Sequence, residues 1–167
     1  MLVGAMNPCP CGYYTDPKKE CHCTPRQILN YISRISGPLL DRIDIHVEVP
    51  NVRYRDLAAD TTCESSEKIR ERVTKERKVQ LKRFQGLKYS TNSRMSTRTM
   101  KKHCLLDNQA EELLHQAMTE LNISARGYNK ILKVGRTIAD LDQSKDVHRE
   151  HISEAIQYRN LDRDLWK

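Results

Sequence analysis

Apolar side chains recur at helical spacing through most of the chain from Ser65 onward. The first helix predicted there is long and heavily charged, because apolar positions return about every 3.6 residues among many Lys, Arg and Glu residues. Its expected core-facing stripe consists of Ile69, Val73, Val79 or Gln80, Leu81 and Phe84. Residues 86–97 are rich in Ser, Thr and Asn without a clear period, which indicates a loop.

Three more helices are predicted after this loop, over about residues 106–121, 124–141 and 148–159. Asp107 and Ser124 are suitable helix starts, because their side chains can accept hydrogen bonds from the free amides of a first turn. Asn122 is a suitable stop, because asparagine tolerates the left-handed conformation that ends many helices. Aromatic residues make up only 5% of the chain, so aliphatic side chains must form most of the core.

The N-terminal part of the chain has a different pattern. Residues 2–6 are apolar and run into an Asn-Pro pair, which is typical of the end of a buried strand. Thr24 and Pro25 form an N-cap and a first helical position, and they predict a helix to about residue 34. Strict apolar alternation over residues 43–49 predicts a second strand. Because the first strand has no sheet to join, we expect the chain to be a truncated piece of a larger core.

Length and composition exclude some classes of protein. With 167 residues and 38% hydrophobic content, the chain can form one domain, or one and a half, with a modest core. No apolar run approaches the roughly 20 residues needed to span a bilayer. The opening residues lack the charged region and the length of a signal peptide. We therefore expect a globular, cytoplasmic protein without a membrane partner.

Four of the six cysteines form two Cys-x-Cys pairs separated by nine residues: Cys9 and Cys11, then Cys21 and Cys23. Two close pairs that bracket a polar loop can supply four thiolates to a tetrahedral Zn²⁺. This spacing is tighter than the common Cys-x₂-Cys, and His22 could replace one sulfur. Reduced thiols or a labile disulfide are the alternative to zinc. Cys63 and Cys104 look incidental.

Positive charge is concentrated in one segment. Residues 66–104 carry 13 Lys or Arg against 3 Glu, whereas the whole chain has a formal net charge of +7. A basic segment of this kind indicates a polyanionic partner, and we expect weak, salt-dependent binding to DNA. A solvated helix face is the other reading of the same residues.

Five longer strings follow one another along the chain: Ala5-Met6-Asn7-Pro8-Cys9-Pro10-Cys11-Gly12, Ser36-Gly37-Pro38-Leu39-Leu40-Asp41-Arg42-Ile43-Asp44, Ser124-Ala125-Arg126-Gly127-Tyr128, Arg136-Thr137-Ile138-Ala139-Asp140-Leu141 and His151-Ile152-Ser153-Glu154-Ala155-Ile156. With them the chain resembles the second half of ComM/YifB-type AAA+ ATPases, which are magnesium-chelatase-like, over nearly its whole length. The resemblance implies an α+β, mostly helical fold. Residues 1–50 would be the C-terminal remnant of an AAA+ α/β core, 51–64 a linker and 65–167 a helical lid-type domain.

The resemblance implies roles for three polar residues. Asn7 looks like the sensor 1 residue that orients the attacking water, since an amide donates and accepts hydrogen bonds without changing protonation. Arg42 looks like the arginine finger offered to a neighbouring subunit, with Arg34 as a nearby rival. Arg126, in the first turn of a predicted helix, looks like sensor 2. The structural alternatives are an Asn-Pro turn, an Arg42 ion pair with an adjacent acid, and an ordinary surface arginine.

The chain has neither a G-x-x-x-x-G-K-[ST] phosphate loop nor an apolar strand ending in paired acids for Mg²⁺. In the resembled family both lie upstream, so ATP and Mg²⁺ are implied for the intact parent, and this chain alone is expected to be inactive. The resemblance implies a homo-oligomeric ring, a hexamer, that translocates on DNA and drives branch migration in recombination and natural transformation. A non-enzymatic, zinc-stabilised nucleic-acid-binding module is the alternative function.

Overall fold

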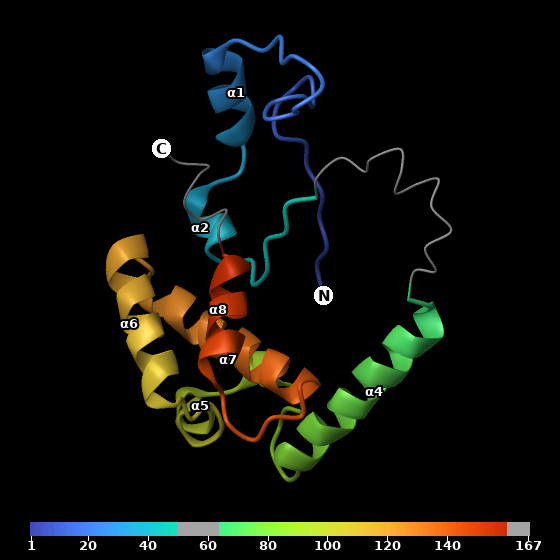
Figure 1. Cartoon of the computed structure of the whole chain (residues 1–167), viewed down its shortest axis with the longest axis vertical. Helices are drawn as coiled ribbons and strands as arrows, with labels where there is room; N and C mark the ends of the chain where they lie inside the picture. The colour runs from blue at the N-terminus through green and yellow to red at the C-terminus, as the bar shows by residue number, and fades with distance from the viewer. Residues whose placement is uncertain (50–63, 160–167) are drawn as a thin grey trace.

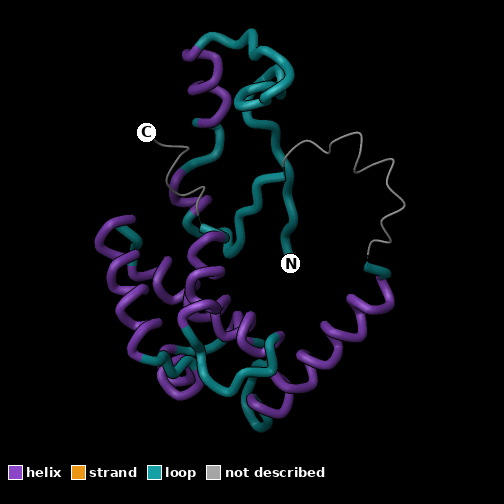
Figure 2. Tube along the Cα trace, in the orientation of Figure 1, coloured by secondary structure: helices purple, strands orange, loops and turns teal. Residues whose placement is uncertain are grey.

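The structure, a computed structural model, describes residues 1–49 and 64–159 as helices joined by loops (Figure 1 and Figure 2). In chain order the elements are α1 (Pro25–Ile32), α2 (Gly37–Leu40), α4 (Ser66–Arg83), the 3-10 helix η1 (Asn92–Arg94), α5 (Thr97–His103), α6 (Asn108–Leu121), α7 (Ala125–Leu141) and α8 (Arg149–Gln157). The prediction of a mostly helical chain is confirmed. The linker predicted at 51–64, apart from its last residue, and Cys63 lie outside the described residues.

The predicted helix starts and the predicted stop are confirmed. Thr24 begins α1 with a capping box, in which its side chain accepts from the Gln27 amide and its own amide donates to the Gln27 side chain at 2.8 Å. Asp107 and Ser124 cap α6 and α7 by accepting a backbone N–H in the first turn. Asn122 ends α6 with a φ of +52°, in the left-handed region. Local side-chain chemistry is therefore sufficient to set these helix ends.

The two strands predicted in the N-terminal part do not form in the described structure. Residues 2–6 and 43–49 are loops, and the side chains of Leu2, Val3 and Val49 are 85%, 79% and 83% exposed. A strand needs a neighbouring strand for its backbone hydrogen bonds, and residues 1–49 and 64–159 contain none. The α/β part of the predicted fold is thus not observed in the described residues.

The core lies between α6, α7 and α8, with α5 and the end of α4 against it (Figure 1). Its central side chains, Leu114, Ile131, Val147 and Ile152, are almost fully buried. Gly135 lets α7 and α8 approach closely, since a Cβ at this position would lie 3.0 Å from the Cδ1 atom of Ile152. The helical domain predicted from apolar spacing therefore has its own core.

The inward face of α4 differs from the predicted apolar stripe. Ile69, Val73, Val79 and Leu81 are 42%, 48%, 40% and 52% exposed. Gln80 and, directly after the helix, Phe84 are buried as predicted, and Glu76, which was not part of the predicted stripe, is buried with them. Figure 1 shows α4 reaching away from the other helices, with its C-terminal end near α7. Because the first half of α4 has no core beneath it in the described structure, its apolar residues remain at the surface.

The loop predicted at 86–97 is present, and it contains η1. Helix α5 was not predicted, although Ser96 caps it by accepting from the Thr99 amide at 3.3 Å. A helix of seven residues has only about two turns, which is too short for an apolar period to be recognised in the sequence. Among the described helices, none has the length and hydropathy that a membrane span requires.

Candidate functional site

The predicted cysteine cluster assembles in the loop before α1. The Sγ atoms of Cys9, Cys11, Cys21 and Cys23 all lie within 4.8 Å of one another. Three of the Sγ pairs are 3.3, 3.7 and 3.5 Å apart: Cys9 with Cys11, Cys9 with Cys21, and Cys11 with Cys21. Sulfurs bound at about 2.3 Å to one tetrahedral Zn²⁺ would be about 3.8 Å apart. The donor set therefore fits zinc, and His22 is exposed and does not belong to the group.

Backbone geometry brings the two Cys-x-Cys pairs together. Gly12 follows the first pair with a φ of +84°, which an L side chain rarely adopts, and its amide donates to the Cys9 carbonyl at 3.0 Å. The Tyr14 amide donates to the Sγ of Cys9 at 3.3 Å. The second pair runs directly into the Thr24 cap of α1. A tight turn on one side and a helix start on the other therefore orient the four sulfurs.

The thiols influence one another strongly. The Tyr13 amide, with the other three thiols and against the effect of burial, lowers the pKa of Cys11 to about 6. At Cys21 the Cys23 amide favours the thiolate, but burial and the hydrogen bonds from Cys11 and Cys9 outweigh it and raise the pKa to about 12. Clustered thiols that cannot all ionise together are good ligands for a divalent cation, which replaces their protons.

A second group of predicted residues meets at the start of α7. The Ser124 hydroxyl donates to the Asp41 carboxylate at 3.1 Å, and Arg126 Nη1 lies 3.4 Å from the same carboxylate. Arg159 approaches Asp41 at 3.6 Å and donates to the Ile43 carbonyl at 3.1 Å. The segment that carries the predicted finger thus lies directly against the predicted sensor 2.

Arg42 itself is exposed, and its Nη1 donates to the Pro38 carbonyl at 3.3 Å. Its predicted structural alternative, an ion pair with Asp41 or Asp44, does not form, since Asp41 contacts α7 and Asp44 pairs with Lys130 at 2.7 Å. Arg34, the rival for the finger role, is exposed in the turn after α1. The Arg42 guanidinium is therefore available at the surface.

Asn7 lies apart from the two arginines. It is exposed in the cysteine loop, where a Cβ added to Gly12 would be 3.7 Å from its amide nitrogen. No described contact connects Asn7 with Arg42 or Arg126. The described contacts of Asp41 thus place the segment that carries Arg42, but not Asn7, beside Arg126.

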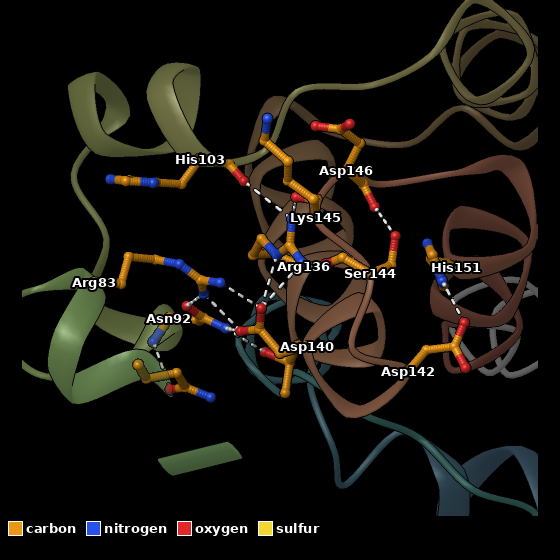
Figure 3. Close-up of polar contacts among 12 residues, drawn as sticks. Arg83, Asn92, His103, Arg136, Asp140, Asp142, Ser144, Lys145, Asp146 and His151 are labelled. Carbon is orange, nitrogen blue, oxygen red and sulfur yellow. Dashed lines mark hydrogen bonds and ion pairs between the residues drawn. The ribbon is translucent and has the colours of Figure 1, made fainter. Parts of the chain in front are cut away.

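A buried polar network inside the helical domain was not predicted (Figure 3). The Asp140 carboxylate is only 1% exposed and accepts from both Nη atoms of Arg83, from Arg136 Nε at 3.0 Å and from Asn92 Nδ2 at 2.8 Å. Arg136 also donates to the carbonyls of residues 144 and 145 at 2.6 and 2.7 Å. The available signal was Arg136 and Asp140 at i,i+4 spacing on the apolar face of α7.

The network explains the polar inward face of α4. Gln80 accepts from the Asn92 amide at 3.1 Å, and Arg83 is the main partner of Asp140. Glu76 is 4% exposed, and burial together with the nearby negative charge of Asp140 raises its pKa. Cys104 is also buried, which raises its pKa to about 11 and is consistent with a core thiol rather than a reactive one.

The basic segment lies mostly at the surface. Of its Lys and Arg residues, all except Arg83 are exposed: Lys68, Arg70, Arg72, Lys75, Arg77, Lys78, Lys82, Lys88, Arg94, Arg98, Lys101 and Lys102. Arg72 pairs with Glu64 at 3.0 Å, so part of this charge is neutralised locally. Lys75, Lys78 and Lys82 follow at helical spacing on the side of α4 opposite Glu76 and Gln80. The outer side of α4 is therefore cationic toward its C-terminal end, while Glu67 and Glu71 lie on the same side nearer its start.

The profile of the family described as magnesium chelatase, subunit ChlI, C-terminal, matches residues 63–159, and that of magnesium chelatase, subunit ChlI, matches residues 1–57. The chain belongs to the magnesium-chelatase-like, ComM/YifB-type family. Its relatives in this family include the competence protein ComM of Haemophilus influenzae, which is 37% identical over 99% of the chain and 32% of its own length. The protein YifB of Escherichia coli is 38% identical over 98% of the chain and 31% of its own length.

The chain is also similar to the protein Rv2897c of Mycobacterium tuberculosis, at 30% identity over 95% of the chain and 31% of that protein's length. The chain spans about a third of the length of these relatives. The family matches cover both the cysteine loop with the Arg42 segment and the helical domain. The resemblance inferred from the five sequence strings is thereby confirmed.

Proposed function

We propose that this chain supplies arginines to an ATP site formed between the subunits of an AAA+ ring ATPase that moves on DNA. The observation that carries the proposal is the contact between the Arg42 segment and the start of α7, where Arg126 lies 3.4 Å from Asp41. Two exposed guanidinium groups are thereby presented at one end of the helical domain. Guanidinium is always charged, and its planar fork matches phosphate oxygens.

In this proposal Arg42 is the finger, and Arg126 is sensor 2. ATP with Mg²⁺, held by upstream residues of the parent protein, would supply the phosphoryl group that is transferred to water. Arg42 would stabilise the negative charge that develops on that group, an effect of roughly 10³ to 10⁵ in rate. Arg126 would add charge at a helix N-terminus, whose free amides already favour phosphate. Asn7 would orient the attacking water.

The partners and the process are proposed from the relatives and from charge. ComM of Haemophilus influenzae is named as a competence protein. Twelve exposed basic residues on α4, α5 and the loop between them suit a DNA backbone. We therefore propose a homo-hexameric cytoplasmic ring whose ATP turnover drives translocation and branch migration of DNA in recombination and natural transformation.

The test uses subunits that carry this chain together with a phosphate-binding loop. Arg42→Ala is expected to abolish ATP turnover while nucleotide binding stays nearly intact, because a finger acts mainly on the transition state. Arg34→Ala, a charge-matched change in the turn after α1, is expected to retain activity.

Mixing distinguishes a finger that acts across the interface from one that acts within a subunit. Arg42→Ala subunits are mixed with subunits whose phosphate-loop lysine is replaced. Each kind lacks a different half of the site, so an intact loop can face an intact finger in mixed rings, and partial activity should return. If mixing restores nothing, Arg42 does not act in trans.

A second candidate function is a non-enzymatic, zinc-stabilised nucleic-acid-binding module. The four clustered sulfurs within 4.8 Å and the basic outer face of α4 favour it. Only the first function requires Arg42 and Arg126 specifically. In a pure binding module, Arg42→Ala and Arg126→Ala would each weaken DNA binding no more than the loss of any other exposed arginine.

A further inference from the structure

The backbone on both sides of Arg42 is attached to the helical domain at several points. Asp41 contacts Ser124, Arg126 and Arg159. Lys130 donates to the carbonyl of Arg42 itself and pairs with Asp44 at 2.7 Å. Four residues after Arg42, the amide of His46 donates to the Tyr158 carbonyl at 2.8 Å. These contacts form a clasp between residues 41–46 and the neighbouring ends of α7 and α8.

The clasp is partly desolvated, which separates it from ordinary surface ion pairs. The side chains of Arg159 and Lys130 are only 4% and 13% exposed, and that of Asp41 is 32% exposed. Arg126 is 54% exposed and Asp44, the partner of Lys130, is 65% exposed, so these two ion pairs are the weaker parts of the clasp. Removing Asp41 would leave the buried Arg159 charge without this carboxylate.

We propose that Asp41 is a positioning residue that fastens the Arg42 segment to α7. The carboxylate is shared between the segment carrying one exposed arginine and the helix carrying the other, so Arg42 and Arg126 move as one unit. A displacement of α7 is then transmitted to Arg42 through Asp41. The mechanical part of this inference rests on the contacts alone, and its catalytic consequence rests on the proposed function of Arg42.

Hydrogen exchange on this chain tests the mechanical part. In Asp41→Ala the amide of His46, which donates to the Tyr158 carbonyl across the clasp, is expected to exchange about tenfold faster or more, because the segment opens locally. Amides in the core of α7 and α8 should keep their protection, which shows that the variant is folded. Asp41→Glu should restore much of the protection, and Glu20→Ala, which removes one exposed acid before α1, should change nothing. Unchanged exchange at His46 in Asp41→Ala would overturn the inference.

Turnover in rings of subunits with a phosphate-binding loop tests the catalytic consequence. A finger misplaced by about 1 Å can lose about 10²-fold in rate, so Asp41→Ala should lower kcat by that order with KM little changed. On the residual turnover of Arg42→Ala, adding Asp41→Ala should cause a smaller loss than it causes in the wild type, because part of the effect of Asp41 is exerted through the Arg42 guanidinium. Additive losses would overturn the positioning role.

The two proposals fail in different ways. If Arg42→Ala leaves turnover intact, the proposed finger is wrong, while faster exchange in Asp41→Ala still supports the clasp. If Arg42→Ala abolishes turnover and Asp41→Ala changes neither exchange nor kcat, the finger stands and the positioning role is overturned.

Discussion

Asp140 shows how one residue can govern the interior of the helical domain. Its carboxylate is buried together with the 2% exposed side chain of Arg136, and it also accepts from Arg83 and Asn92. The buried Arg136 and the 13% exposed Arg83 share this one carboxylate, and Arg136 satisfies its remaining donors by donating to backbone carbonyls at 2.6 and 2.7 Å. Such a network is tolerated only because nearly all of its donors have partners.

Asp140→Ala is therefore expected to destabilise the chain by about 3–5 kcal/mol, because it leaves the Arg136 and Arg83 charges buried without their carboxylate. Urea unfolding followed by circular dichroism measures the change. Asp142→Ala is the matched control two residues further on, since Asp142 is 74% exposed and contacts only the His151 ring, at 3.3 Å, among the described residues. The control should cost less than about 1 kcal/mol. Equal losses in the two variants would contradict the role of the network.

At the scale of elements, local side-chain contacts decide where a helix begins and ends, whereas packing against distant parts of the chain decides which face of the helix is buried. The starts of α6 and α8 are joined through their caps, because the Asp107 carboxylate lies 2.7 Å from Nδ1 of His148. The hydrogen bond to Asp107 raises the pKa of His148, and the hydrogen bond to His148 lowers the pKa of Asp107. The contact between α6 and α8 is therefore pH-dependent.

His148→Gln should reduce the free energy of unfolding most between about pH 4 and pH 6.5, where both groups of the pair are charged. The raised pKa of His148 means that its contribution is complete below the usual histidine pKa and is lost as pH rises through the raised value. The lowered pKa of Asp107 means that its contribution is lost as pH falls through the lowered value. Urea unfolding from pH 3 to pH 9 gives the profile. If the difference in the free energy of unfolding between the wild type and the variant does not change with pH, the ion pair is contradicted.

The four clustered cysteines lead to a separate prediction, that the chain binds a metal ion. Protein purified without chelator should contain about one Zn²⁺ per chain by elemental analysis, and Cys11→Ser should lower that content sharply. Chelation should expose the amides of the loop before α1 to hydrogen exchange, because the loop has little apolar core of its own. Cys104→Ala, a change in the helical core, should leave the zinc content unchanged. Metal-free protein with a protected loop would rule out a structural zinc.

At the scale of the whole molecule, the cysteine loop with α1 and the helical core occupy opposite ends of the structure, while α4 extends to one side (Figure 1). Segment 41–46 connects the two ends through the clasp on α7 and α8. Helix α4, which carries seven of the exposed basic residues, extends to one side of this connection (Figure 1). In the proposed function, DNA binding and arginine positioning would therefore use different parts of the structure.

Replacing Lys75, Lys78 and Lys82 with Ala should weaken DNA binding and reduce its salt dependence, since each lost phosphate contact lowers the slope of log K against log salt by about one. Fluorescence anisotropy with labelled duplexes at roughly 50 to 200 mM salt measures both the affinity and its salt dependence. We expect the affinity to fall on the order of tenfold at the lower salt. The charge-matched control replaces Lys18, Lys19 and Arg26, which are exposed around the cysteine loop. An equal effect of both triple variants would show that only net charge matters.

The sequence alone determined the elements whose signals are local. Helix starts at Thr24, Asp107 and Ser124, the stop at Asn122, and the family were predicted correctly, because capping and motif order depend on neighbouring residues. The clustering of the four cysteines was expected as one of two alternatives, and the structure brings their sulfurs together.

Tertiary structure alone decided which surfaces meet. The two predicted strands failed because their hydrogen bonds depend on neighbours that no local pattern supplies. The face of α4 was predicted only in part: Gln80 and Phe84 are buried as expected, but Glu76 is buried next to the Asp140 network, whose members are up to 57 residues apart in sequence. Asp41 contacts Ser124 across 83 residues, and this contact places the segment that carries Arg42 against the start of α7. Long-range partners of polar residues leave no periodic trace in a sequence, so only the folded chain reveals them.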